Sequence, residues 1–150
     1  MRIAIAADHA GYELKEAIEL RLRELGHEVE DCGAPAFVPG DDYVAYCAAA
    51  ARAVSRGDAD RAIVIGGSGQ GEAIIANRFR NVRCALWYGG DPALARLSRE
   101  HNDANALSLG ARFVTPAEAI PVVEMWLEVP FSNEPRHARR IGRLEEESKF

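Results

Sequence analysis

Short apolar runs alternate with segments of helical periodicity along almost the whole chain. The runs predict five strands, which span residues 3–7, 27–32, 62–65, 83–87 and 106–109. Between them, apolar residues recur at helical spacing, as Leu14, Ile18 and Leu22 do. This periodicity and the end signals predict six helices, over about 11–25, 41–57, 70–79, 91–102, 115–128 and 134–148.

Capping residues mark several of the predicted helix ends. Gly26 is suited to a C-cap, and either Asp41 or Asp42 can cap the second helix. Asp91-Pro92 opens the fourth helix, since proline is favoured at the first helical position. Thr115-Pro116-Ala117-Glu118 matches a capping box, which starts the fifth.

Strands that alternate with helices indicate the α/β class. We expect a single domain over 1–150, built on a doubly wound open parallel sheet of about five strands in the order 2-1-3-4-5. Helices would cover both faces, and an extra C-terminal helix would lie outside this alternation. In such sheets, ligands bind beyond the carboxyl ends of the strands.

The composition of the chain argues against several classes of function. The chain has 150 residues, 48% of them hydrophobic and 27% charged, as expected of a globular domain. A net charge of −5 argues against general attraction to nucleic acid or anionic membranes, and no apolar stretch approaches the roughly 18 residues of a membrane span. Without a signal-peptide pattern, and with three widely spaced cysteines, we expect a cytoplasmic protein with reduced thiols.

The most informative segment is the glycine loop, which we define as Gly66–Gly71, followed at once by Glu72. Glycines allow backbone N–H groups to converge on an anion and let a ligand approach closely. The loop fits neither the dinucleotide fingerprint nor a P-loop. A carboxylate beside an anion hole suits proton abstraction next to a carbonyl, although a tight turn with a dipole-favoured Glu72 is the structural alternative.

Further polar residues follow the predicted strands and helices. Asp8 and His9 come directly after the first strand, where Asp8 could equally cap a helix. His101 and Asn102 end the fourth helix, a position at which the helix dipole favours histidine anyway.

Arginines supply the candidate phosphate site. Arg136 and Arg140 are four apart on one helical face and could clamp a phosphate, or pair with the glutamates at 145–147 on a solvated helix. Arg112, just after the fifth strand, could reach the same anion.

Together these segments resemble the ribose-5-phosphate isomerase type B family, which includes the galactose-6-phosphate isomerase subunits. The resemblance covers essentially the whole chain. It rests on Ala7-Asp8-His9-Ala10-Gly11-Tyr12, Asp42-Tyr43, Gly66 to Glu72, Ala76-Asn77, Arg99-Glu100-His101-Asn102 and Arg136-His137-x-x-Arg140.

The resemblance implies a cofactor-independent aldose–ketose isomerase, with no metal, that converts ribose 5-phosphate and ribulose 5-phosphate through a cis-enediolate. It implies a homodimer or a dimer of dimers, with the site at the dimer interface. The implied roles are as follows: Glu72 as base; Gly67, Ser68, Gly69, Gln70 and Gly71 around the enediolate oxygen; His101 in ring opening; Asp8, His9 and Asn102 on sugar or phosphate oxygens; Tyr43 at the pocket floor; and Arg112, Arg136 and Arg140 on the phosphate.

Two departures from the family pattern matter. Many members carry a cysteine base at the position of Gly67, so a cysteine mechanism is excluded here and Glu72 matches the subgroup that uses glutamate. Val44 stands where a proline commonly follows the Asp-Tyr pair, which could reshape the floor beside Tyr43. Four- and six-carbon sugar phosphates therefore remain alternatives, as do a non-catalytic phosphate- or nucleotide-binding module and a subunit of a hetero-oligomer.

Overall fold

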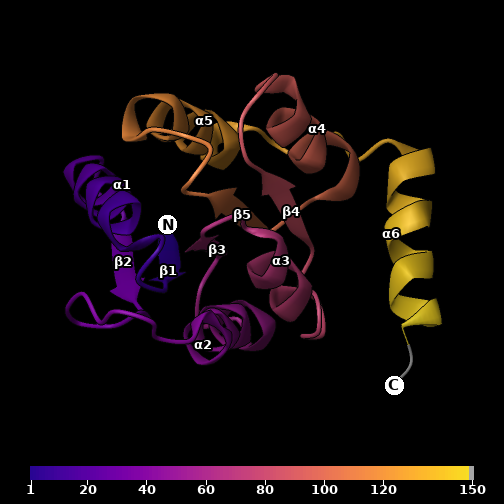
Figure 1. Ribbon diagram of the computed structural model, residues 1–150. Helices are drawn as coiled ribbons and strands as arrows, with labels where there is room; N and C mark the ends of the chain where they lie inside the picture. Colours follow the sequence, from indigo (N-terminus) through magenta and orange to yellow (C-terminus); the bar gives the residue numbers. More distant parts are fainter. Residues whose placement is uncertain (149–150) are drawn as a thin grey trace.

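The five strands form one all-parallel sheet in the order β2-β1-β3-β5-β4 (Figure 1). They are β1 (Arg2–Ala7), β2 (Glu28–Asp31), β3 (Arg61–Gly66), β4 (Cys84–Trp87) and β5 (Ala106–Gly110). These elements come from a computed structural model, which describes residues 1–148. The predicted α/β class and parallel sheet are confirmed.

The predicted strand order 2-1-3-4-5 is wrong, because β5 lies between β3 and β4. The burial of the two strands explains why β5 and β4 have exchanged places relative to the prediction. Every residue of β5 is buried, whereas three of the four residues of β4 are only half-buried. A strand that is covered on both faces belongs inside a parallel sheet, and the less covered strand takes the edge.

Helices cover both faces of the sheet (Figure 1). On one face lie α1 (Tyr12–Glu24), α4 (Ala93–Asn102) and α5 (Pro116–Glu128); on the other lie α2 (Tyr43–Arg56) and α3 (Gln70–Ala76). Side chains alternate along each strand, so Ile3 and Ile5 join the first layer while Ala4 and Ala6 join the second. The second layer is rich in alanine.

Most helix ends follow their capping signals. Gly26 adopts the left-handed conformation directly after the C-cap Leu25, and Thr115 forms the complete capping box with Glu118. Asp42, rather than Asp41, caps α2 by accepting a hydrogen bond from the N–H of Val44.

The third helix is shorter than predicted and ends at Ala76 instead of about residue 79. Asn77 is the reason. Its side-chain amide donates to the carbonyls of Ala73 and Cys84, and its side-chain oxygen accepts from the N–H of Cys84. These bonds turn the chain towards β4.

The last helix, α6 (Pro135–Glu147), stands apart from the layers, as predicted (Figure 1). Its contacts with the rest of the chain are made mainly to α4, and His137 is its one fully buried residue. No helix within residues 1–148 has both the length and the hydrophobicity required to cross a membrane.

Candidate active site

The glycine loop lies at the carboxyl edge of the sheet, where β1, β3 and β5 end together. Parallel pairing aligns Ala7 with Ile65 and Ile65 with Leu109. The residues that follow these strands, Asp8, the glycine loop and Arg112, therefore meet at one edge. The sequence predicted this grouping.

Hydrogen bonds from β5 and the segment after it hold the glycine loop. The N–H of Ala111 donates to the Gly66 carbonyl at 2.8 Å, and that of Arg112 donates to the Gly67 carbonyl at 3.1 Å. The buried Ser108 hydroxyl donates to the Gly69 carbonyl at 2.6 Å. Ser108 was not among the predicted site residues; its signal is a single polar residue inside an apolar strand.

Glu72 lies in the first turn of α3 and is only 4% exposed. Its carboxylate occupies the space above Gly66, where a Cβ atom would fall 1.7 Å from Oε1. A Cβ on Gly71 would likewise fall 2.2 Å from the Tyr43 hydroxyl oxygen. Glycine is needed at both positions so that these two side chains can approach the loop.

The environment of Glu72 raises the pKa of its carboxyl group. Burial is the main cause, because it disfavours the charged form, and the negative charge of Asp8 adds to it. A hydrogen bond from the residue's own N–H acts in the opposite direction. The result is a stronger base than an exposed glutamate, in a position that suits catalysis.

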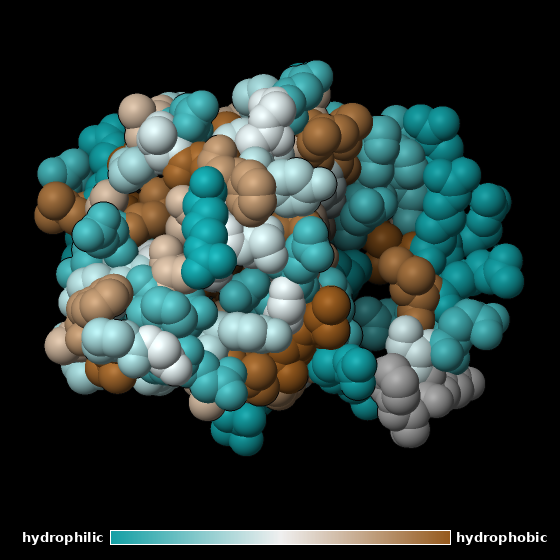
Figure 2. Space-filling view, in the orientation of Figure 1, coloured by the Kyte–Doolittle hydropathy of each residue, from teal (hydrophilic) through white to brown (hydrophobic). Residues whose placement is uncertain are grey.

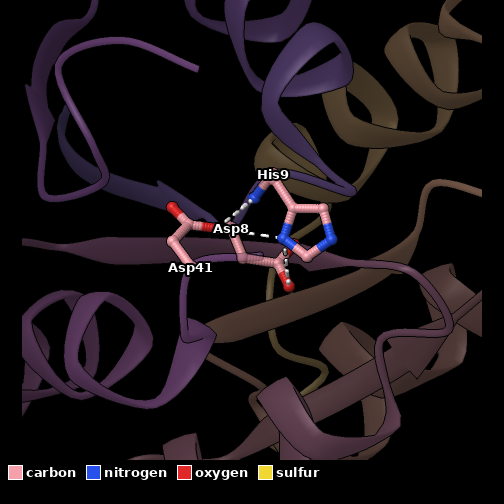
Figure 3. A group of neighbouring side chains, drawn as sticks. All are labelled: Asp8, His9 and Asp41. Carbon is pink, nitrogen blue, oxygen red and sulfur yellow. Dashed lines mark hydrogen bonds and ion pairs between the residues drawn. The ribbon is translucent and has the colours of Figure 1, made fainter. Parts of the chain in front are cut away.

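Asp8, His9 and Asp41 form a cluster in which Asp41 accepts hydrogen bonds from His9, and Asp8 lies within ion-pair distance of the His9 ring (Figure 3). Asp8 is buried and accepts from the N–H groups of Ala10 and Gly11, at 3.0 and 3.3 Å. These bonds form a turn before α1 and are not the helix cap that the sequence left as an alternative, because the N-cap is Gly11 and it has no side-chain capping bond. Asp8 nevertheless keeps its other oxygen 3.8 Å from Nδ1 of His9.

Two clusters within residues 1–148 have the spacing of metal ligands, and hydrogen bonds or ion pairs link the side chains in each of them. Asp8, His9 and Asp41 offer ligand atoms within 4.8 Å of one another, yet Nδ1 of His9 lies at 3.0 Å from Asp41, the distance of a hydrogen bond. In the second cluster, Glu16, Glu19 and Asp31 surround the ammonium group of Lys15.

His101 and Asn102 lie at the opposite edge of the sheet from Glu72. They end α4, and the Asn102 carbonyl accepts a hydrogen bond from Arg83, the residue directly before β4. That contact places them at the amino edge. Within one chain, these predicted site residues are therefore not brought to the glycine loop.

His101 instead pairs with His137 of α6. The two rings have centroids 4.3 Å apart. Nδ1 of His137 lies 2.9 Å from the Ser132 hydroxyl, and the Ser132 N–H donates to the Glu100 carbonyl at 3.0 Å. His137 belongs to the quoted Arg-His motif but was not predicted as a site residue.

The three predicted phosphate-binding arginines also lie in two different places, one at the glycine loop and two on α6. The guanidinium of Arg112 lies 3.2 Å from where a Cβ of Gly67 would be, so this arginine reaches the loop. Arg136 and Arg140 are exposed on α6, where Arg136 pairs with Glu134 at 2.8 Å.

The alternative pairing of Arg136 and Arg140 with the glutamates at 145–147 is not seen within residues 1–148. There Glu145 pairs with Arg83 and Glu147 with Arg143.

Known proteins match nearly the whole chain. The family model described as Ribose/Galactose Isomerase matches residues 3–144. Ribose-5-phosphate isomerase B of Mycobacterium tuberculosis is 45% identical over 146 residues, which is 97% of this chain and 89% of that protein. The Escherichia coli protein of the same name is 38% identical over 140 residues, with 93% and 91% covered.

Solved structures agree. Ribose-5-phosphate isomerase B of Clostridium thermocellum superposes with a TM-score of 0.92 at 42% identity, covering 97% of this chain and 96% of that one. The Mycoplasma genitalium enzyme with bound ribulose 5-phosphate gives 0.91 at 36% identity, covering 99% and 97%.

Proposed function

The chain belongs to the Ribose/Galactose Isomerase family, and we propose that it interconverts ribose 5-phosphate and ribulose 5-phosphate through a cis-enediolate. The family predicted from the sequence motifs is confirmed, and so is the isomerase class. The observation that carries the mechanism is the buried Glu72 carboxyl, with its raised pKa, against the glycine loop.

In this mechanism Glu72 takes a proton from the carbon next to the substrate carbonyl. Negative charge then develops on oxygen, and backbone N–H groups of Gly67–Gly71 donate hydrogen bonds to it. Preorganised donors of this kind typically contribute on the order of 10²–10³ in rate each. The hydroxyl proton passes from its own oxygen to the former carbonyl oxygen, so that the new carbonyl can form where the hydroxyl was. The protonated Glu72 then returns its proton to the former carbonyl carbon, which completes the aldose–ketose exchange.

We further propose that the complete site forms between two copies of the chain. Asp8, Glu72 and Arg112 lie at the carboxyl edge, whereas His101 and Arg140 lie on elements at the other side of the molecule. If all of them serve one substrate, the second set comes from a partner. This agrees with the predicted homodimer, in which both subunits contribute to each site.

The surface beside α6 supports this arrangement. A groove of about 770 Å³ separates α6 from the body, and Phe79, Val82 and Leu144 are among its lining residues. Figure 2 shows α6 set off from the body, with hydrophilic residues on its outer side. Leu144 is 55% exposed although it faces this groove. A second copy of the chain would cover such apolar surface.

The test is a coupled isomerase assay of the purified chain on four-, five- and six-carbon sugar phosphates. We expect turnover of the five-carbon pair, and a loss of about 10²–10⁴ in kcat for Glu72→Gln. Glu13→Gln is the matched control, since Glu13 lies exposed in the first turn of α1.

Other outcomes would identify the alternatives. Preference for a four- or six-carbon substrate would correct the sugar but keep the chemistry. Nucleotide binding without isomerase activity would favour a binding module, and activity only with a second, different chain would favour a hetero-oligomer. A cytoplasmic location and independence from cofactors remain predictions.

A further inference from the structure

The side chain of Asp41 is buried although the residue lies on an exposed segment. Residues 35–40, which lead from β2 towards α2, are exposed, and so is Asp42. The side chain of Asp41, by contrast, is only 7% exposed. Contacts with other residues of the protein, rather than water, therefore hold this carboxylate in place.

The holding contacts come from His9. One oxygen of Asp41, Oδ1, accepts from the His9 backbone N–H at 2.7 Å and faces ring Nδ1 at 3.0 Å (Figure 3). Oδ1 already acts as an acceptor for the backbone N–H, so the contact with the ring favours a proton on Nδ1 that is donated to the same oxygen. Asp8 lies further away, at 3.8 Å from the same nitrogen, which leaves Asp41 as the acceptor.

Helix capping does not explain Asp41. Its neighbour Asp42 caps α2, so the helix begins without Asp41. Its second oxygen, Oδ2, is buried and has no hydrogen-bond partner among residues 1–148. A buried acceptor without a partner lowers stability. The buried position of Asp41 therefore lowers the stability of the fold, and its contacts hold His9 in place.

We propose that Asp41 is a positioning residue for His9 in the isomerase site. It anchors both the backbone and the ring of His9, keeps the proton on Nδ1, and leaves Nε2 as the atom presented to the substrate. With its proton on Nδ1, His9 then accepts a hydrogen bond from a sugar hydroxyl through Nε2. The second ring nitrogen lies on the side away from Asp41 (Figure 3). Only the identity of the hydroxyl donor rests on the proposed function.

The direct test is the tautomer of His9, measured by ¹⁵N NMR of histidine-labelled protein at alkaline pH. The chain has four histidines, and the signals missing from His9→Asn identify those of His9. We expect a protonated Nδ1 and an unprotonated Nε2 in the wild type. Asp41→Ala should move the proton to Nε2, whereas Asp41→Asn keeps an accepting oxygen and should keep the wild-type tautomer.

Kinetics provide the second readout. Asp41→Ala should lower kcat/KM by roughly 10–100-fold, by analogy with the loss of the hydrogen-bond partner that orients a metal-bound histidine. Asp41→Asn should recover most of this loss. Asp42→Ala is the matched control. It should lower the melting temperature through loss of the helix cap, and leave the His9 tautomer unchanged.

An Nε2–H tautomer in the wild type would overturn the proposal without any variant. So would a wild-type tautomer in Asp41→Ala. The NMR measurement needs no substrate, so it tests the role of Asp41 even if the isomerase assay detects no turnover. The proposed role of Asp41 and the proposed isomerase function can therefore be contradicted independently.

Discussion

At the scale of single residues, Glu72 combines burial with a nearby like charge. A buried carboxylate beside Asp8 is costly to ionise, and both features raise its pKa. A base with a raised pKa is better matched to removing a weakly acidic carbon-bound proton near neutral pH. The same features that weaken the fold therefore strengthen the base.

The charge of Asp8 should be visible in the pH profile. Asp8→Asn removes the neighbouring negative charge, so the pKa of Glu72 should fall and the acidic limb of kcat/KM should move to lower pH. Burial of Glu72 remains, so the limb should stay above the position expected of an exposed glutamate. A profile of kcat/KM against pH checks this. An unchanged acidic limb would mean that Asp8 does not act on the base.

Glu72 should also lower stability at neutral pH. Its folded pKa lies above the unfolded value, so the folded state is favoured below the unfolded pKa and loses that advantage as pH rises through the folded pKa. Glu72→Gln removes the ionisation and should raise the melting temperature at pH 7, with a smaller gain at pH 4. Thermal unfolding at both values, with Glu13→Gln as control, measures this. A less stable Glu72→Gln at pH 7 would contradict it.

At the scale of elements, the helix ends with local capping signals could be predicted, but the end of α3 and the order of the strands could not. Caps such as Asp42 and Thr115 act through bonds to residues two or three positions away, so the sequence carries the whole signal. The place of β5 between β3 and β4 depends on contacts between residues far apart in the chain. Asp41 was considered only as a helix cap because its bond to His9 spans 32 positions.

The glycine loop offers a test in which Glu72 itself is unchanged. A methyl group in Gly66→Ala would fall 1.7 Å from Oε1 of Glu72 and displace that carboxylate. The carboxylate ends a flexible side chain, so we expect the protein to fold. A catalytic group displaced by about 1 Å costs on the order of 10² in rate. Measured kcat should fall accordingly while the circular dichroism spectrum is retained. A fully active Gly66→Ala variant would show that catalysis does not require the Glu72 carboxylate at its position against Gly66.

At the scale of the whole molecule, the sequence predicted the family because its motifs lie along the entire chain. It also predicted a set of site residues, and the fold distributes these residues over two separate surfaces. The carboxyl edge holds Asp8, Glu72 and Arg112, and the α4–α6 side holds His101 with Arg136. The proposed assembly of two chains would unite them.

A mixture of two inactive variants tests that assembly. Glu72→Gln and His101→Asn damage different halves of the proposed composite site, so a mixed dimer contains one intact site and one doubly damaged site. A statistical mixture of the two chains should recover about a quarter of wild-type activity, given two-fold symmetry. Co-expression with two affinity tags isolates the mixed dimer. If the mixed dimer forms and stays inactive, Glu72 and His101 do not act across the interface.

The most direct measurement of the central claim, that Glu72 moves a carbon-bound proton, is hydrogen exchange in deuterated water. Ribulose 5-phosphate is incubated with wild-type protein or with Glu72→Gln, and deuterium on the sugar carbons is followed by NMR. We predict that the wild type incorporates deuterium as it isomerises, and that exchange with Glu72→Gln is slower by about 10²–10⁴. Exchange by Glu72→Gln at the wild-type rate would show that another group is the base.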